Sequence, residues 1–257
     1  YDSRYPWKLI NDTVTSKGAS DDGYGLGVIL ECVHQALKYR ESWNQGIKVL
    51  FTDAEEVDLQ GMKAAHQYNK EIFNDVGLIL NIESRGPFGP VLLFETSPRN
   101  EQLVKLYANH ARYPFAYSIM NMVYQKMPNG TDMNIVRDSI PGFNFSPIAD
   151  INHYHTDLDN IHNISKTTIQ HYGEQVVPII KEYLTNTIYD DKEYLKAEED
   201  LIYFSIPLLG MYHFTKNQYW LLNIGLCLLL LHLLMKKISM TPHAHCVQEC
   251  GGGIYIH

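Results

Sequence analysis

The sequence predicts an α/β fold, a three-layer α/β/α sandwich with a mostly parallel mixed sheet. Short runs of β-branched and aromatic residues, typical of buried strands, alternate with longer stretches in which apolar residues recur at helical spacing. Strands that are separated by helical stretches favour helices packed on both faces of a largely parallel sheet. The chain has 257 residues, 45% of them hydrophobic, which is enough for a substantial core and excludes intrinsic disorder.

The predicted elements follow one another up to residue 200 without an internal repeat. Helices are expected where apolar side chains recur every three to four residues, and strands where a short apolar run is bounded by glycine, proline or acidic residues. The expected elements are a helix over 27–40, a strand over 47–52, a helix over 59–69, strands over 76–82 and 91–95, a helix over 100–112, a strand over 142–148 and a helix over 165–185.

Charge and cysteine content exclude two classes of protein. The chain carries 21 basic and 29 acidic residues, so its net charge is −8 and no basic stripe is present to bind nucleic acid. The four cysteines, Cys32, Cys227, Cys246 and Cys250, are too few and too scattered for a disulfide scaffold.

Composition changes near residue 187. We expect a domain over 1–187, a charged linker over 188–200, an interfacial plus transmembrane segment over 201–237 and an irregular tail over 238–257. Residues 219–235 carry no charge and span roughly 26 Å as a helix, near the minimum for a bilayer. A buried core helix is the alternative for this segment.

The flanks of the apolar segment predict its orientation. Tyr219 and Trp220 form an aromatic anchor at one end, and Lys236 and Lys237 form a positive flank at the other. If the lysines mark the cytoplasmic side, the preceding domain is extracytoplasmic: periplasmic, extracellular, or in a vacuolar or endoplasmic-reticulum lumen. Residues 201–214 are too short for a span and predict either an interfacial segment or an edge element packed under the domain.

Four short motifs gather carboxylates and histidines at predicted strand or helix ends. These motifs are GASDDGYG at 18–25, DAEE at 53–56, NIESRG at 81–86 and HYHTD at 153–157. Taken singly, each motif can also be explained by structure, for example as a helix cap or a solvated loop. Together they could meet at the carboxyl edge of one sheet, where divalent cations would offset the repulsion among the acids. Histidine with aspartate or glutamate suits zinc in an open catalytic site.

The ordered set GASDDGYG, DAEE, NIESRG, NGTD and HYHTDLDN resembles the co-catalytic zinc peptidases of family M28. It is most similar to their membrane-bound branch, the vacuolar and endoplasmic-reticulum type with bacterial relatives. The resemblance covers residue 1 to about 185 and implies the zinc-exopeptidase-like sandwich. It also implies two zinc ions per active site.

The resemblance implies a role for each matching residue. Asp21 would bridge the two metals, Glu56 and His155 would be ligands, and Glu83 would bind the other metal. Glu55 would be the general base. Asp22 follows Asp21 through a peptide bond that is typically cis in the family.

One expected ligand has no counterpart in the chain. The first zinc ligand of the family is the histidine of an H-x-D motif, and the opening Tyr1-Asp2-Ser3-Arg4 is similar to the continuation of H-Y-D-S-R. Asp2 would then orient that histidine. We therefore expect an N-terminally truncated fragment that binds one metal weakly or not at all, and that can be inactive for this reason. His243, His245, Cys246 and Cys250 could bind a metal, but a disordered or foreign tail is the preferred interpretation.

Three further residues are candidates for supporting the site or binding substrate. Asp132 lies in the NGTD motif, with a helix cap as the alternative. Arg85 is close enough to Glu83 in sequence to face the same cleft, with a salt bridge to an acid as the alternative. His153 could line the pocket, although packed surface histidines are more common.

The resemblance implies hydrolysis of peptide bonds by an aminopeptidase that uses a two-zinc-bridged water and Glu55 as general base. The implied partners are a peptide or protein with a free N-terminus and membrane lipid, with no nucleic acid. Two alternatives stay open: a glutaminyl cyclase-like acyltransferase with one zinc, and a non-enzymatic M28-like membrane scaffold or receptor ectodomain. Every ligand position present in the chain is filled, which argues against a decayed site.

Overall fold

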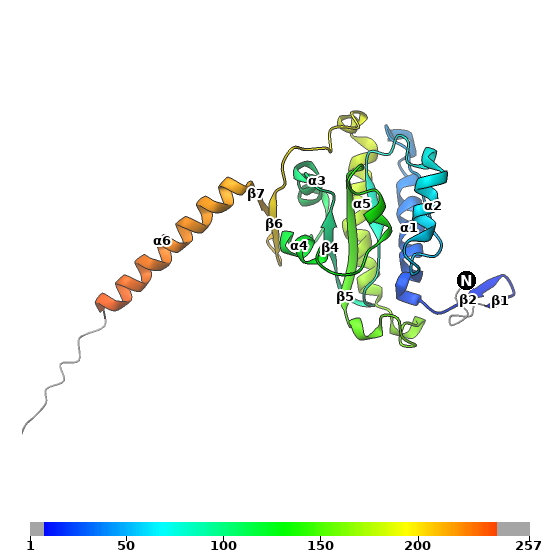
Figure 1. The fold of residues 1–257 in the computed structure, drawn as a ribbon, viewed down its shortest axis with the longest axis horizontal. Helices are drawn as coiled ribbons and strands as arrows, with labels where there is room; N and C mark the ends of the chain where they lie inside the picture. Colours follow the sequence, from blue (N-terminus) through cyan, green and yellow to red (C-terminus); the bar gives the residue numbers. More distant parts are fainter. Residues whose placement is uncertain (1–7, 241–257) are drawn as a thin grey trace, which may run out of the picture. The chain divides into compact units, whose positions relative to one another are not determined.

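The computed structural model describes residues 8–240, so the predictions for Asp2 and for the Cys/His tail lie outside the described residues. The chain divides into two compact units, Tyr1–Lys216 and Asn217–His257. The first unit holds the sheet and its covering helices, and the second holds one long helix (Figure 1). The domain boundaries drawn from composition stay a prediction.

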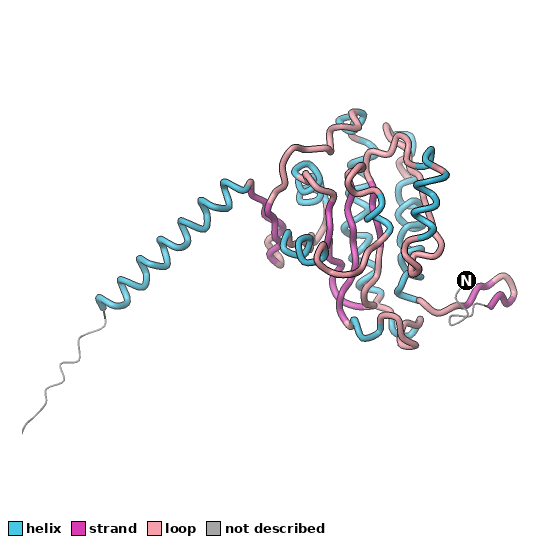
Figure 2. Tube along the Cα trace, in the orientation of Figure 1, coloured by secondary structure: helices cyan, strands magenta, loops and turns pink. Residues whose placement is uncertain are grey.

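A mixed sheet forms the centre of the first unit, which confirms the predicted α/β class. Its strands are β3 (Ile79–Ile82), β5 (Gly142–Ala149) and β4 (Phe88–Thr96), in the order β3-β5-β4. β3 runs parallel to β5, with Ile79 opposite Gly142, and β4 runs antiparallel to β5. Figure 2 shows the strands in magenta among the helices in cyan. The parallel pair carries Glu83 and the segment leading to His155 to the same edge of the sheet.

Helices cover both faces of this sheet. α1 (Gly25–Leu37), α3 (Glu101–His110) and α5 (Lys166–Thr185) pack on the face to which β5 contributes the fully buried rings of Phe143 and Phe145. α4 (Ser118–Tyr124) packs on Leu92 and Phe94 of β4, and α2 (Gln60–Tyr68) contributes Met62 to a separate small core with Val136 and Ile140. In β4, Val91 and Leu93 belong to the larger core, whereas Leu92 and Phe94 belong to the core under α4. Alternating side chains of this strand therefore pack in opposite layers.

The sheet continues beyond β4 through two isolated bridges. Leu93 pairs with Ala116, and Tyr117 pairs with Phe204 in β6. β6 (Ile202–Ile206) and β7 (Gly210–Phe214) form an antiparallel hairpin. Residues 201–214 thus form the expected edge element, and the expected interfacial role of this segment stays a prediction.

The predicted strand over residues 47–52 is wrong. This segment forms no ladder, and Val49, Leu50 and Phe51 are exposed. An apolar pocket, also lined by Leu78 and Leu80, separates this segment from β3. The segment therefore does not pair with that strand. A β-branched sequence becomes a strand only where a partner supplies hydrogen bonds, which local propensity does not ensure.

The remaining elements are short. A hairpin of β1 (Lys8–Ile10) and β2 (Thr13–Thr15) was not predicted and has exposed side chains along β1. A π-helical turn, η1 (Ala19–Tyr24), precedes α1. The 3₁₀ turns are η2 (Arg40–Ser42), η3 (Lys70–Ile72), η4 (Asp132–Ile135), η5 (Ile151–His153), η6 (Ile161–Asn163) and η7 (Thr187–Asp190).

The second unit is built on α6 (Lys216–Met240). Within the described residues, Lys216–Ser239 is the one helix long and apolar enough to cross a membrane, with a mean hydropathy of 1.8 and no buried share in its apolar window. Asn223 donates its side-chain amide to the carbonyl of Tyr219 at 2.8 Å, so this polar group is satisfied within the helix. α6 is thus a candidate membrane span, as the sequence predicts.

Candidate metal centre

Asp21 is held in a tight turn at the start of α1. The turn begins at Gly18, which has a φ of 80° and whose carbonyl accepts a hydrogen bond from the backbone N–H of Gly23 at 3.0 Å. The Asp21–Asp22 peptide bond is cis, which confirms the expectation from the resemblance. A Cβ at Gly25 would overlap the side-chain carboxylate of Asp22, so a larger residue there would displace this carboxylate.

The carboxylate of Asp159 fixes this turn from another part of the chain. It accepts hydrogen bonds from the backbone N–H and the hydroxyl of Ser20, at 2.7 and 2.9 Å, and from the backbone N–H of Asp21 at 3.0 Å. Asp159 is buried. Sequence reasoning missed this residue, and the only signal was its place in the DLDN end of the HYHTDLDN motif.

Glu55 and Glu56 lie on a loop packed against the start of α2. The loop turns at Ala54, which adopts a left-handed φ of 55°. The carbonyl of Asp53 accepts a hydrogen bond from the backbone N–H of Gly61 at 2.9 Å, and a Cβ at Gly61 would overlap this carbonyl. The close backbone approach therefore sets the position of both glutamates.

His155 brings Asp21 and Glu56 together. Its Nε2 lies 2.8 Å from Oε1 of Glu56 and 3.2 Å from Oδ2 of Asp21. The imidazole stacks on the ring of Tyr154, with 3.6 Å between ring centroids. The ligand atoms of Asp21, Glu56 and His155 all lie within 4.8 Å of one another, a spacing that one divalent cation could bridge.

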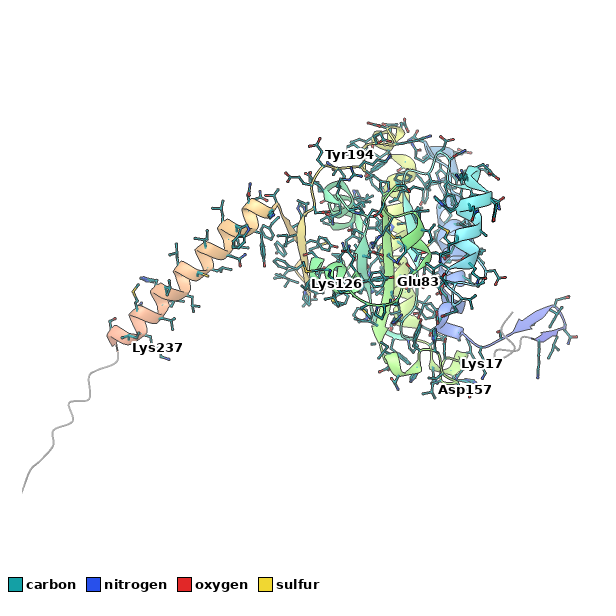
Figure 3. The ribbon with its side chains drawn as sticks, in the orientation of Figure 1. Lys17, Glu83, Lys126, Asp157, Tyr194 and Lys237 are labelled. Atoms are coloured by element: carbon teal, nitrogen blue, oxygen red, sulfur yellow. The ribbon has the colours of Figure 1, made fainter. Side chains whose placement is uncertain are left out.

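Glu83, labelled in Figure 3, follows the last residue of β3 and is partly buried. Its backbone N–H donates to the carbonyl of Phe145 at 2.9 Å, which continues the parallel ladder. Asn81 donates to the Glu83 carboxylate at 3.1 Å and to the side-chain oxygen of Asn144 at 2.9 Å. Glu83 is not a member of the three-residue group, but its charge acts on Asp21.

The acids of the site repel one another. Burial, and then the charges of Glu56 and Glu83, raise the pKa of Asp21 to about 8. Burial and the charge of Glu55 raise the pKa of Glu83 to about 8. Burial and the charge of Glu56 raise the pKa of Glu55 to about 7. A divalent cation would relieve this repulsion and favour the ionised carboxylates, so the donor set fits a zinc site.

Two of the predicted supporting residues, Asp132 and Asp22, lie close enough to the acids of the site to interact with them electrostatically. Asp132 accepts a hydrogen bond from the hydroxyl of Thr52, which ties η4 to the start of the glutamate loop. The cap of η4 is Thr131, so Asp132 is not the cap itself. Oδ1 of Asp22 is buried without a hydrogen-bond partner, while burial and the charge of Glu83 raise the pKa of Asp22 well above its usual range.

Arg85 and His153 differ in where they point. Arg85 lies over the ring of Tyr154, 4.7 Å from the centroid, and its charge lowers the pKa of Glu55. It lines the same pocket as Asp21 and Glu55. The ring of His153 packs perpendicular to that of Phe88, and His153 is not among the residues that line this pocket, so its predicted role stays a prediction.

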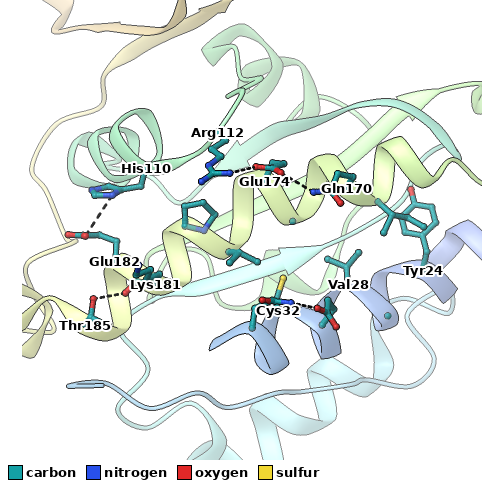
Figure 4. A pocket seen from close by; sticks show the side chains of 17 residues that line it. Tyr24, Val28, Cys32, His110, Arg112, Gln170, Glu174, Lys181, Glu182 and Thr185 are labelled. Carbon is teal, nitrogen blue, oxygen red and sulfur yellow. Dashed lines mark hydrogen bonds and ion pairs between the residues drawn. The ribbon is translucent and has the colours of Figure 1, made fainter. Parts of the chain in front are cut away.

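A small pocket of about 100 Å³ opens beside the acids. Its lining includes Asp21, Glu55 and Glu83, apolar side chains from β4, α4 and β5, and polar residues such as Arg85, Asn129 and Ser146. A larger hollow of about 820 Å³ lies between α1 and α5, away from the site (Figure 4). Its charged rim is paired internally, with Arg112 3.2 Å from Glu174, and it does not contain any of the predicted ligands.

A family model described as peptidase family M28 matches residues 1–180. The chain belongs to this family. Endoplasmic reticulum metallopeptidase 1 of Mus musculus is 28% identical over 256 residues, which are 95% of this chain and 28% of that protein. Its Homo sapiens counterpart is 32% identical over 183 residues, 68% of this chain and 20% of that protein. No solved structure gives a significant match.

The M28 relatives include vacuolar proteins as well. A vacuolar membrane protease of Verticillium alfalfae is 30% identical over 182 residues, which are 68% of this chain and 17% of that protein. Both membrane-associated groups named by the resemblance are therefore among the relatives. The chain spans less than a third of the length of each of these M28 proteins.

Proposed function

We propose that this M28 chain supplies the catalytic part of a zinc-dependent aminopeptidase. The observation that carries the proposal is the convergence of Asp21, Glu56 and His155 within 4.8 Å, beside Glu55. The names of its M28 relatives support peptidase chemistry. We therefore propose that the predicted catalytic and metal-binding residues form one active site.

Two zinc ions are proposed, held by different parts of the cluster. Asp21, Glu56 and His155 would hold one, and Glu83 would contribute to the other together with Asp21. When bound, zinc would polarise the scissile carbonyl and make a water molecule more acidic. Asp159 would keep Asp21 in place, and Asn81 would orient the carboxylate of Glu83.

Glu55 is the proposed general base. A pKa of about 7 allows its carboxylate to take a proton from the attacking water and to return it to the leaving amine near neutral pH. As the water oxygen bonds to the carbonyl carbon, the carbon–nitrogen bond breaks and the amine leaves with that proton. Arg85 faces the same pocket and would donate a hydrogen bond to a substrate oxygen.

A free N-terminus on the substrate is proposed from the charge of the pocket end. Asp21, Glu55 and Glu83 line that end, and a substrate ammonium group would be attracted to them. No other carboxylate lines the pocket among the described residues.

The test separates zinc binding from proton transfer in the full chain. Glu55→Gln should keep its zinc, measured by metal analysis, and lose about 10²- to 10⁴-fold in kcat for aminoacyl-amide hydrolysis. Glu56→Gln should lose zinc itself, and the exposed Glu71→Gln should match the unaltered chain. Full activity in Glu55→Gln would reject the mechanism, and zinc binding without turnover would favour the scaffold alternative.

Membrane anchoring by α6, with the peptidase domain extracytoplasmic, is proposed from its apolar length and its lysine flank. An arginine at the middle of a span costs about 2.5–3.5 kcal/mol. Leu228→Arg should therefore release part of the chain from membranes in alkaline carbonate extraction, whereas Lys237→Arg should not. Protease added outside sealed cells or vesicles of known orientation would test the side on which the domain lies.

A further inference from the structure

The turn of the β6–β7 hairpin carries a leucine where both solvent and backbone disfavour it. The carbonyl of Ile206 accepts a hydrogen bond from the backbone N–H of Leu209 at 3.0 Å, which closes a four-residue turn with Pro207 and Leu208 at its centre. Leu208 has a left-handed φ of 67° and is fully exposed. Glycine or asparagine suits this third position of the turn. A leucine there therefore contributes neither to the turn nor to the core.

The apolar surface continues from the turn along one face of the hairpin. β6 presents Phe204 and Ile206 on this face, and β7 adds Tyr212, which lies directly opposite Phe204, and Phe214. The rings of Tyr212 and Phe214 stack on that of Phe204, with centroids 6.2 and 5.9 Å away. No aspartate, glutamate, lysine or arginine occurs in residues 201–215. The face is therefore aromatic and uncharged, and Ile206 and Tyr212 are exposed on it.

A hollow of about 640 Å³ lies beside the turn. Tyr113, Pro114 and Phe115 line it together with the turn residues, and no aspartate, glutamate, lysine or arginine is among its lining in the described part of the chain. His171 also lines the hollow, and its Nε2 lies 2.9 Å from the carbonyl of Tyr113, so this polar group has a partner. Tyr113 is 71% exposed. The hollow therefore extends the apolar surface around the turn.

The chain itself holds this surface near the candidate membrane span. β7 ends at Phe214 and α6 begins at Lys216, so one residue separates the hairpin from the helix. Leu208 lies eight residues before Lys216, and an extended chain of eight residues spans at most roughly 28 Å. This limit holds for every arrangement of the two units. Because the tether keeps the turn close to the lipid, even a weak affinity for the bilayer is effective.

We propose that the turn of the β6–β7 hairpin inserts into the interfacial layer of the bilayer that α6 spans, as a second membrane contact of the chain. This inference rests on the proposed membrane span and not on the proposed peptidase activity. Leu208 and Leu209 enter among the acyl chains, and Tyr212 lies at the level of the head groups, where aromatic side chains are enriched. The contact is apolar and holds the peptidase domain against the membrane surface.

Tryptophan fluorescence tests the contact in the full chain, reconstituted in phosphatidylcholine vesicles with brominated acyl chains as quencher. After subtraction of the native tryptophan signal, the fluorescence added by Leu208→Trp should be blue-shifted and quenched. Tyr68→Trp, at the 73% exposed end of α2, is the matched control and should add unquenched fluorescence. Equal, weak quenching in both variants would overturn the proposal. A blue shift of Leu208→Trp without quenching would also overturn it, because protein and not lipid would then cover the turn.

Substitutions of Leu208 separate insertion from folding, with Leu209→Trp as the reporter. Leu208→Asp should lower the ratio of quenched to unquenched reporter by about tenfold or more, since a buried leucine is lost from the contact. Leu208→Gly suits the left-handed φ, so it should lower the ratio without lowering the melting temperature. Tyr68→Asp should leave the reporter unchanged. Undiminished quenching in Leu208→Asp would overturn the proposal.

Lipid composition and the native tryptophans complete the test. Adding phosphatidylserine should leave the quenching unchanged, because residues 201–215 contain no lysine or arginine, and a requirement for it would overturn the apolar contact. Trp220 lies in α6, so native quenching reports the span itself. If the native signal is quenched and that of Leu208→Trp is not, only the hairpin proposal fails. If neither is quenched, the span fails with it. Hydrolysis of a soluble aminoacyl-amide should be equal in Leu208→Asp and the unaltered chain.

Discussion

The carboxylate of Asp159 accepts a hydrogen bond from the backbone N–H of Asp21 at 3.0 Å, across 138 residues of sequence. The same carboxylate binds Ser20 twice, so three donors converge on one buried acid. Charge-assisted hydrogen bonds of this kind are stronger than neutral ones. Asp159 therefore couples the loop that carries His155 to the turn that carries Asp21.

Replacing Asp159 by asparagine should weaken zinc binding about 10- to 100-fold without unfolding the chain. The new amide would face two backbone N–H groups with a neutral acceptor or with its own N–H donors, and the turn would lose its fixed position. Competition against a chromophoric zinc chelator gives the affinity.

Asp157→Asn is the matched control for this prediction. Asp157 lies in the same loop, is exposed and contacts Lys17 at the surface (Figure 3). Its zinc affinity should stay within a factor of two or three of the unaltered chain, on the order of a surface effect. Equal losses in both variants would show that the loop as a whole, and not the Asp159 carboxylate, supports Asp21.

A second prediction concerns Gly61. A Cβ at this position would overlap the carbonyl oxygen of Asp53 and lie 2.7 Å from its nitrogen, both backbone atoms that cannot rotate away. Gly61→Ala should therefore displace the loop of Glu55 and Glu56, lowering both zinc affinity and kcat.

Gly27→Ala provides the comparison for Gly61→Ala. Gly27 lies in α1, and an added Cβ there meets nothing within 4 Å. Alanine is favoured over glycine in a helix by about 1 kcal/mol, so this variant should unfold at a slightly higher temperature and keep its activity. If Gly61→Ala behaved in the same way, the close approach of α2 to the glutamate loop would not matter for the site.

A third prediction concerns the buried amide of Asn144. It donates to Glu95 at 3.0 Å and to Thr131 at 2.8 Å, and accepts from Asn81, while Glu95 pairs with Arg137. Asn144→Ala leaves several buried groups without partners, which costs about 2–4 kcal/mol. The melting temperature should fall by about 5–10 °C, measured by scanning calorimetry.

The exposed Asn69→Ala is the control for Asn144→Ala and should change the melting temperature by less than about 2 °C. Zinc affinity is the informative second readout, because Asn144 reaches Glu83 through Asn81. A large thermal effect with unchanged zinc affinity would mean that the network supports the core and not the position of Glu83.

The parts of the fold that were predictable are those with strong local periodicity. The helices over 25–37 and 166–185 show apolar spacing typical of a helix, and β3 and β5 are short runs rich in β-branched or aromatic residues. Residues 47–52 have the same composition as β3 but form no ladder. Whether a segment joins a sheet depends on the strands beside it, so strand propensity alone could not distinguish residues 47–52 from β3.

The β6–β7 hairpin shows a similar limit. Its apolar content suggested either an interfacial segment or an edge element, and the structure forms an edge hairpin in which burial alternates along β6, with Tyr203 and Ser205 buried. This period of two is typical of a strand with one covered face. The alternation was readable only once the neighbouring bridge from Tyr117 to Phe204 was known.

The candidate site was predictable in its residue types because the five motifs occur in a specific order. The structure brings Asp21, Glu56 and His155 together, whereas His153 makes its ring contact with Phe88. Asp159 was missed because a single aspartate in a polar loop carries no local pattern. Its partners are 138 and 139 residues away, so only the folded chain reveals its role.

The last prediction is the pH dependence of the metal-free chain. The pKa values of Asp21 and Glu83 are raised to about 8 in the folded state, above the usual carboxyl range near 4 that they have when unfolded. The folded state thus binds more protons, and the stability linked to these groups is fully present below pH 4 and is lost as the pH rises through 8. Between pH 5.5 and 8.5 the melting temperature of the metal-free chain should therefore fall.

Zinc should reverse this trend, because it stabilises the ionised carboxylates that the empty cluster disfavours. The rise in melting temperature on adding zinc should be larger at pH 8 than at pH 5.5, measured by calorimetry in the presence and absence of a chelator. Glu83→Gln removes one of the titrating acids and should flatten the slope of the metal-free chain. A slope unchanged in Glu83→Gln would assign the pH dependence to groups outside the cluster.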